Sequence, residues 1–376
     1  MTALRLSLAA ALVFPIALSA QTQPAPSSPA LDFSGILFAN YQYRVDDGPS
    51  RSANRFDLER AYLTFRMPAG DRASIRITAD VFQQTTPGND SYYRGWTMRA
   101  KYAFLQYNYL TSGDWKANAR VGLLPTVFIE HDEQFWPRWI SPSPTDRAGY
   151  FSSADAGISN TVSLPNKRGE IYAAIANGPG YTSREVDRFK DYSARVTLTP
   201  WVKNSRSMLR GIAASAWAYK GATASKFADG GQGQTGSIGS ALDRDRWGIH
   251  LGNINPRVTF GAEYASRREE GELGSNTSTA PREVVDSTGT LLSGYAVVRP
   301  FPSGKARPHP LSLVARYDRV TVNTDSDARY DVIIGGLIWD LTTKVSASIN
   351  YQENNSVHGS PVTASRIWFA HFVARF

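Results

Sequence analysis

RIWFAHFVARF, residues 366–376, is a stretch in which apolar side chains alternate with mixed ones up to Phe376. Counting back from Phe376 in steps of two gives one wholly apolar face, made of Ala374, Phe372, Ala370 and Trp368. The opposite face is mixed and carries Arg375, Val373, His371, Phe369 and Ile367. Such a strand would be an aggregation-prone edge in a soluble sheet, but it suits the closing strand of a barrel that contacts lipid. The stretch therefore predicts a transmembrane β-barrel.

The start of the chain has the pattern of a secretory signal, with Arg5, an apolar run over residues 6–18 and the small residues Ser19 and Ala20. The run is too short to span a bilayer. We expect residues 1–20 to be a cleaved signal peptide, residues 21–32 a periplasmic tether and residues 33–376 a barrel in the bacterial outer membrane. The chain has no cysteine, so we expect neither disulfides nor lipid attachment through a cysteine.

Composition narrows the class of protein. Hydrophobic residues make up 42% of the chain, yet no run of 18 apolar residues follows the signal, which excludes a helical membrane protein. The 12% of aromatic residues and the 30 glycines favour strands, tight turns and aromatic girdles. The net charge of +8 favours anionic partners. The export signal argues against nucleic acid as one of them.

The chain divides into sixteen alternating segments, each bounded by Gly, Pro, Asn or Asp. They are residues 33–45, 55–67, 73–83, 99–110, 115–123, 157–164, 170–176, 189–198, 209–220, 246–251, 257–267, 291–299, 311–322, 329–339, 344–351 and 365–376. Short links such as 111–114 alternate with long ones such as 221–245, as in barrels with short periplasmic turns and long external loops. Links 300–310 and 323–328 break this alternation. The prediction is an all-β, antiparallel barrel of about sixteen strands.

The alternation also predicts which side chains face inward. Segment 115–123 places Trp115 and Val121 outside but Lys116 and Arg120 inside, and segments 257–267 and 344–351 repeat this polar-in pattern. A barrel of about sixteen strands is too wide for side chains to plug, so a polar interior indicates a water-filled channel. The channel-lining residues expected to attract anions are Arg60, Arg66, Arg76, Lys116, Arg120, Arg195, Arg257 and Arg316.

The alternative is that these cations pair across the wall with inward carboxylates, which leaves weak selectivity. The candidate carboxylates are Asp80, Glu170, Asp191, Glu263 and Asp318. The stretch 56–66 changes phase midway, which predicts a β-bulge.

Residues 124–156 form the longest irregular stretch and contain Phe135, Trp136 and Trp139 together with four prolines. Loops of this length are usually functional or disordered, and this aromatic content favours order. We expect this third external loop to fold into the lumen and to contribute Arg138 and Arg147 to a constriction. The alternative is a surface loop or a contact between subunits.

Several stretches resemble, in order and spacing, the phosphate-selective porin O and P family. They are FDLERAYLTFRMPAG (56–70), SIRITADV (74–81), AFLQY (103–107) and ARVGLLP (119–125) with Thr126, Phe128 and the final Phe376. The resemblance is best in the first third and diffuse from 203 to 307. It implies a sixteen-stranded trimeric porin with an inward third loop and an arginine track that includes Arg60, Arg66, Arg76 and Arg120. The chain departs from the family in having no run of Arg and Lys within 124–156. This departure argues against phosphate specificity more than against a porin function.

The sequence gives little evidence for metal binding, nucleotide binding or catalysis. The five histidines lack metal-ligand spacing, and no phosphate-binding glycine loop follows a strand. We predict no catalytic residues, no metal and no cofactor. The predicted function is passive diffusion of small hydrophilic, preferably anionic solutes, with phosphate-like anions among them. The expected partners are outer-membrane lipid, lipopolysaccharide and, from the resemblance, two further copies in a homotrimer. The alternative is a barrel enzyme or adhesin that uses the long external loops.

Overall fold

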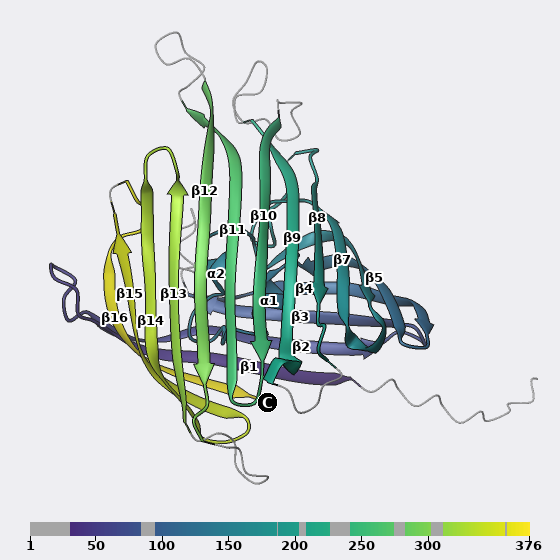
Figure 1. Cartoon of the computed structure of the whole chain (residues 1–376), viewed down its shortest axis with the longest axis horizontal. Helices are drawn as coiled ribbons and strands as arrows, with labels where there is room; N and C mark the ends of the chain where they lie inside the picture. Colours follow the sequence, from purple (N-terminus) through teal and green to yellow (C-terminus); the bar gives the residue numbers. More distant parts are fainter. Residues whose placement is uncertain are drawn as a thin grey trace, which may run out of the picture.

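The computed structural model describes residues 31–83, 95–185, 187–202, 208–225, 241–273, 283–301, 311–357 and 359–376. The predicted signal peptide and most of the predicted tether lie outside these residues. Sixteen antiparallel strands pair in chain order, and the first strand pairs with the last, so that the sheet closes into a barrel (Figure 1). The predicted fold class and strand number are confirmed. None of the described helices is long and apolar enough to cross a membrane.

The elements are β1 (Asp32–Arg44), β2 (Asn54–Pro68), β3 (Ala73–Gln83), β4 (Trp96–Ser112), β5 (Trp115–Pro125), α1 (Ile129–Asp132), α2 (Pro144–Arg147), β6 (Ala154–Ser163), η2 (Pro165–Lys167), β7 (Gly169–Ala176), β8 (Asp191–Leu198), η3 (Met208–Gly211), β9 (Ile212–Ala224), β10 (Ala241–Ile254), β11 (Val258–Leu273), β12 (Glu283–Val298), β13 (Ser312–Asn323), β14 (Ala328–Asp340), β15 (Val345–Ser356) and β16 (Ser365–Arg375). Every predicted segment overlaps one strand. The predicted segments 246–251 and 291–299 cover the smallest parts of their strands, β10 and β12. Both strands begin with residues whose polarity does not alternate, ALDRD in β10 and EVVDSTGT in β12.

The outer face of the barrel is apolar, and the inner face is polar over much of its area. In β16 the side chains of Trp368 and Phe372 are about half exposed, whereas His371 and Val373, on either side of Phe372, are buried. In β15 the buried, inward side chains are Ser346, Ser348, Asn350 and Gln352. Exposed apolar residues on other strands complete the outer surface: Val121, Ile158, Ile171, Ile175, Val196, Leu198, Trp247, Ile249, Leu251, Leu292, Leu313, Ile333, Leu337, Trp339 and Ile349. An exposed apolar surface of this extent fits contact with lipid.

The barrel closes where Gly35 meets Phe376. The backbone N–H of Gly35 donates to the carbonyl of Phe376 at 2.9 Å, and the N–H of Phe376 donates back to Gly35 at 3.0 Å. The ring of Phe376 covers Gly35 so closely that a Cβ atom there would lie 2.2 Å from it. The ring of Phe33 lies 5.9 Å from the same ring. The closing seam therefore depends on a residue without a side chain at position 35.

Two β-bulges, one on β2 and one on β4, change which residues face inward. The pairing of β1 with β2 shifts at Phe38 and Ala39 and skips Glu59, which confirms the bulge predicted from the phase change. The pairing of β3 with β4 shifts in the same way and skips Lys101. A bulged strand can point two consecutive side chains to one side, and Lys101 and Tyr102 are both buried within the barrel.

Candidate functional site

Residues 126–153, which join β5 to β6 and include α1 and α2, lie inside the barrel, where Figure 1 draws both helices between its walls. The loop reaches strands across the barrel from its own. The Tyr150 hydroxyl donates to the carbonyl of Ala265 on β11 at 3.1 Å. The Gln352 side chain on β15 donates to the carbonyl of Ile140 at 2.9 Å. These bonds hold the loop, hereafter the inner loop, against the inner faces of β11 and β15.

An apolar layer joins the inner loop to the wall. The buried loop residues include Phe128, Phe135, Trp136, Trp139, Ile140 and Tyr150. They share one core with inward residues of the opposite strands, namely Trp217, Leu291, Tyr295, Val297, Val314, Val332, Ile334 and Ile338. The prediction of a polar interior holds only in part on this side of the barrel. Ser215 of β9, Ser293 of β12 and the pair Arg316 and Asp318 of β13 are buried and polar, whereas the inward residues beside them are apolar. The inner loop covers these apolar residues with a second apolar layer.

Polar groups are buried beneath the inner loop as well. The Tyr295 hydroxyl donates to Asp132 Oδ1 at 2.6 Å, and His131 Nε2 lies 2.9 Å from Ser215 Oγ. Burial raises the pKa of Asp132 to about 7. Burial, together with the nearby charge of Arg195, lowers the pKa of His131 to about 2, which keeps this histidine neutral. This histidine of α1 therefore packs against the barrel wall at Ser215 of β9.

The raised pKa of Asp132 predicts a pH dependence of folding stability. The folded pKa lies above the ordinary value of 3.8, so the folded protein binds this proton more tightly than the unfolded chain does. The contribution of Asp132 to stability should therefore be greatest below about pH 4 and fall toward pH 7, by at most about 1.4 kcal/mol per pH unit. His131, whose folded pKa is lowered, contributes with the opposite sign, so the effect of Asp132 is the difference between the wild type and a variant that lacks this carboxyl group. Glu133, Glu263, Arg316 and Tyr295 carry the other titratable groups that face Asp132.

The check is the unfolding midpoint of the refolded barrel between pH 4.5 and 7.5, followed by tryptophan fluorescence. The stability of the wild type relative to Asp132→Asn should fall as the pH rises through this range, because the variant lacks the titrating carboxyl group. Asp286→Asn is the matched control, since Asp286 is half exposed and pairs with Arg268. Equal pH slopes in wild type and Asp132→Asn would contradict the prediction.

Three of the predicted lining residues lie elsewhere than predicted. The Arg316 side chain is fully buried, pairs with Asp318 and donates to the carbonyl of Pro142. Arg195 is also buried and binds Glu170 and the carbonyl of Val127. These two arginines support the inner loop, because it covers the wall on which they stand. Arg257 lies in the turn before β11, which begins at Val258, and is exposed.

The arginines on β2, β3 and β5 form a row on the inner face. Arg66 stands directly opposite Arg76 across the β2–β3 pairing. The guanidinium carbons of Arg76 and Arg120 lie 6.0 and 5.2 Å from the centre of the Phe104 ring between them. We call Arg66, Arg76 and Arg120 the arginine row. The sequence prediction named all three, and the structure places them side by side.

The partners of these cations differ. Arg76 bonds Glu130 of the inner loop at 2.8 Å, Arg120 donates to the Gln106 amide at 2.9 Å, and Arg66 lies 3.8 Å from Asp32 with both side chains about half exposed. Two further predicted residues stand beside the row. Arg60 pairs with Asp80 at 3.0 Å, as the pairing alternative predicts. Lys116 is exposed at the start of β5.

The two residues predicted for the constriction take different positions on the inner loop. Arg138 lies 3.4 Å from Glu59, the bulge residue of β2, and 3.4 Å from Glu133. It faces the β1–β4 wall. Arg147 donates to Ser141 at 2.7 Å and to Asn354 of β15 at 2.8 Å, so it fastens the loop to β15.

A cavity of about 340 Å³ separates the inner loop from the β1–β4 wall. Its charged lining is Arg76, Lys101, Arg138, Arg375, Glu130 and Glu133, and its aromatic lining is Phe38, Tyr62, Tyr102, Trp136 and Trp139. A second cavity, of about 430 Å³, shares Glu133, Trp136, Trp139 and Arg375 with the first and extends to the turn 341–344. The two cavities therefore adjoin and continue toward the end of the barrel that carries the short turns.

Sequence reasoning missed Lys101 and Arg299 among the lining residues. Simple alternation with Tyr102 and Phe104 would put Lys101 on the lipid face. A lysine there costs about 2–4 kcal/mol near the middle of the bilayer. The unfavourable placement of a lysine on the lipid face could therefore have indicated a bulge at Lys101.

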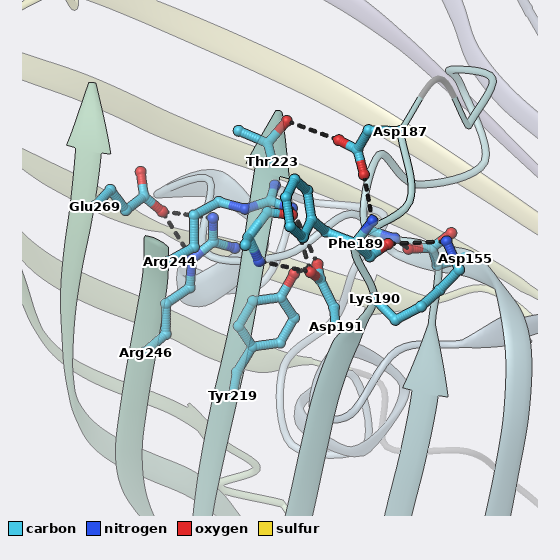
Figure 2. Close-up of polar contacts among 12 residues, drawn as sticks. Asp155, Asp187, Phe189, Lys190, Asp191, Tyr219, Thr223, Arg244, Arg246 and Glu269 are labelled. Carbon is cyan, nitrogen blue, oxygen red and sulfur yellow. Dashed lines mark hydrogen bonds and ion pairs between the residues drawn. The ribbon is translucent and has the colours of Figure 1, made fainter. Parts of the chain in front are cut away.

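The opposite wall carries charges that are mutually paired. Figure 2 shows Asp191 of β8 between Tyr219 and Arg244, whose guanidinium lies 3.2 Å away. Arg246 pairs with Glu269 on the next strand. Asp187 accepts the backbone N–H groups of Phe189 and Ala224, at 2.7 and 2.9 Å, and so ties the loop before β8 to β9. The part of the chain that the structure describes holds no cluster of three or more metal-ligating side chains.

Neither a protein-family model nor a curated protein sequence matches this chain. Solved structures match it over nearly its whole length, although with low identity. OmpF of Salmonella typhi, solved with daunomycin, has a TM-score of 0.62 at 12% identity and covers 93% of this chain and 98% of its own. This chain has a porin fold. The outer membrane channel DcaP of Acinetobacter baumannii gives 0.60 at 13%, covering 93% and 98%. The anion-selective porin from Comamonas acidovorans gives 0.59 at 12%, covering 93% and 100%.

Proposed function

We propose that this protein is an outer-membrane porin, a passive channel for small hydrophilic solutes that prefers anions. The observation that carries the proposal is the arginine row on the inner wall of a barrel whose outer face is apolar. Arg66 and Arg120 have no carboxylate closer than 3.8 Å among the described residues, and Arg76 has one, Glu130. A wall with excess positive charge inside a low-dielectric barrel raises the local concentration of anions.

The proposed path runs between the inner loop and the β1–β5 wall. Solutes move along it down their concentration gradient, and no covalent step is needed. Guanidinium groups along the wall replace part of an anion's hydration shell. The pairing of Arg76 with Glu130 moderates the field, so we expect a preference for anions rather than exclusion of cations.

Planar lipid bilayers test the proposal directly. The purified, folded protein should produce discrete conductance steps, and its reversal potential in a potassium chloride gradient should show higher permeability for chloride. Protein that inserts but conducts no ions would overturn the proposal. A barrel enzyme or adhesin would then be the remaining interpretation of the long external loops.

Neutralising the arginine row should shift the selectivity toward cations. In the double variant Arg76→Gln/Arg120→Gln, two positive charges are lost and Glu130 is left without its partner. We expect the chloride-to-potassium permeability ratio to fall at least about threefold. Arg319→Gln is the control, because Arg319 is half exposed on β13 and pairs with Asp331 away from the cavity. An unchanged reversal potential in the double variant would mean that these side chains do not face the ion path.

We include phosphate-like anions among the solutes, since guanidinium groups bind phosphate oxygens in pairs and Arg66 and Arg76 stand opposite each other. Block of the chloride current by phosphate at lower concentration than by sulfate would support this finer specificity.

Export and trimer formation belong to the same proposal. The mature protein isolated from outer membranes should begin at Gln21, which N-terminal sequencing measures. Chemical cross-linking of the protein in native membranes should yield a trimer as its largest product. The apolar exterior of the barrel is compatible with contact both to lipid and to a second barrel.

A further inference from the structure

Lys101 of β4 is a buried cation whose ammonium group faces two tyrosine rings. Only 4% of its surface is exposed. Among the described residues none accepts a hydrogen bond from its Nζ or lies within ion-pairing distance of it. Its Nζ instead lies 4.2 Å from the centre of the Tyr62 ring and 5.4 Å from that of Tyr102. An ammonium group has three donors, and burying it unpaired is unfavourable. Lys101 is therefore equipped to receive an anion from outside the protein.

The neighbouring cations differ from Lys101 in this respect. Arg76 is bound to Glu130 at 2.8 Å, and Arg138 lies within 3.7 Å of the three carboxylates Glu59, Glu133 and Asp146. Arg375, the remaining cation of the lining, is exposed. Lys101 is thus the buried cation of this cavity that an incoming anion can pair with at no cost to an existing ion pair.

The surroundings of Lys101 are aromatic. Phe38 and Tyr62 meet edge to face with their ring centres 5.7 Å apart, and Tyr102, Trp136 and Trp139 complete the aromatic side of the same cavity. Its volume of about 340 Å³ is sufficient for a solute with one six-membered ring. Aromatic rings prefer edge-to-face and offset contacts with one another. A strongly hydrated inorganic anion would gain nothing from these walls, whereas an aromatic anion would gain from both the walls and the cation.

We propose that the cavity between the inner loop and the β1–β4 wall is a binding site for small aromatic carboxylates of about the size of benzoate. The carboxylate pairs with Lys101 Nζ, and the ring contacts Tyr62, Phe38 and Trp139. The site lies on the proposed path through the barrel, so it names a class of solute that the channel accepts. The proposal rests on the proposed channel function and deepens it.

Four probe solutes in planar bilayers test the proposal. Benzoate has the charge and the ring, cyclohexanecarboxylate has the charge and a saturated ring, acetate has the charge alone, and benzamide has the ring alone. Benzoate should block the chloride current at concentrations at least tenfold lower than each of the other three. Quenching of tryptophan fluorescence by benzoate in the detergent-folded protein provides a second measurement of binding, since Trp136 and Trp139 line the cavity.

Variants at position 101 identify the cation. Lys101→Met should raise the benzoate concentration needed for block at least tenfold, so that benzoate and acetate block at similar concentrations. Lys101→Arg should retain the stronger block by benzoate. Lys220→Met is the matched control, because Lys220 is exposed on β9 and pairs with Asp245. If Lys101→Met does not fold, the four-solute comparison on the wild type and Lys101→Arg still decides the question.

The outcomes separate the two proposals. Absence of any conductance would overturn the channel function itself. Normal conductance with equal block by benzoate, cyclohexanecarboxylate and acetate would overturn the aromatic site and leave the channel. Stronger block by inorganic phosphate than by benzoate would make this an inorganic-anion site and would overturn the proposal as well.

Discussion

Replacement of Arg316 by methionine is expected to destabilise the folded barrel by about 3–5 kcal/mol, because it removes one half of a buried ion pair. The guanidinium of Arg316 makes bonds of 2.9 and 2.5 Å to the Asp318 carboxylate. It also donates to the carbonyl of Pro142 on the inner loop and lies 5.0 Å from the centre of the Trp136 ring. Without it, Asp318 would keep the Ser293 hydroxyl as its hydrogen-bond donor, in a site that already contains Glu263 and Asp132.

Urea unfolding of the barrel in lipid vesicles, followed by tryptophan fluorescence, measures this loss. Arg319→Met is the matched control on the same strand, because Arg319 is half exposed and its pair with Asp331 should contribute at most about 1 kcal/mol. The double variant Arg316→Met/Asp318→Leu should recover much of the stability, since it leaves no unpaired charge. Equal losses for the two single variants would contradict the buried role of Arg316.

Trp136→Ala is expected to have an effect of similar size, about 3–5 kcal/mol, through loss of packing beneath the inner loop. Trp136 is 1% exposed and is among the largest fully buried side chains. Its indole N–H donates to the carbonyl of Ser141 at 2.9 Å, and its ring meets that of Tyr295 edge to face at 5.4 Å. The contact with Tyr295 joins the loop to β12, and the bond to Ser141 lies within the loop. Loss of both should therefore weaken loop docking before it affects the strands.

Two measurements should show this order of events. Unfolding experiments give the loss of stability, and single-channel recordings should show larger current fluctuations than in the wild type, because a detached loop moves within the path. Trp339→Ala is the control, as Trp339 is more than half exposed on the outer face of β14. A quiet channel with wild-type conductance in Trp136→Ala would mean that the docked loop does not border the conducting path.

Most of the barrel was predictable from sequence because lipid on one side and polar surroundings on the other impose a two-residue period. That period identified β15 and β16 residue by residue, including the buried Ser348 and the exposed Phe372. It became uninformative over residues 283–290 of β12, where Val284 and Val285 are followed by polar residues and glycine, so that neither face of the strand is consistently apolar.

The interior was predictable only in part, because alternation gives the direction of a side chain but not what covers it. Arg76 and Arg316 both point inward, yet Arg76 borders a cavity while Arg316 is sealed beneath the inner loop. That difference depends on contacts between residues such as Arg316 and Pro142, which are far apart in the sequence. Lys101 was missed for a local reason, since a one-residue bulge reverses the facing that simple alternation predicts.

The pairing of β1 with β16 has a consequence for the timing of assembly. Gly35 and Phe376 exchange hydrogen bonds although nearly the whole chain separates them. Contacts of such long range are slow to form because a large loop must be closed first. Until β16 arrives, the growing sheet has two unpaired edges, each able to join another chain. The assembling barrel can therefore associate with other chains through these edges until β16 pairs with β1.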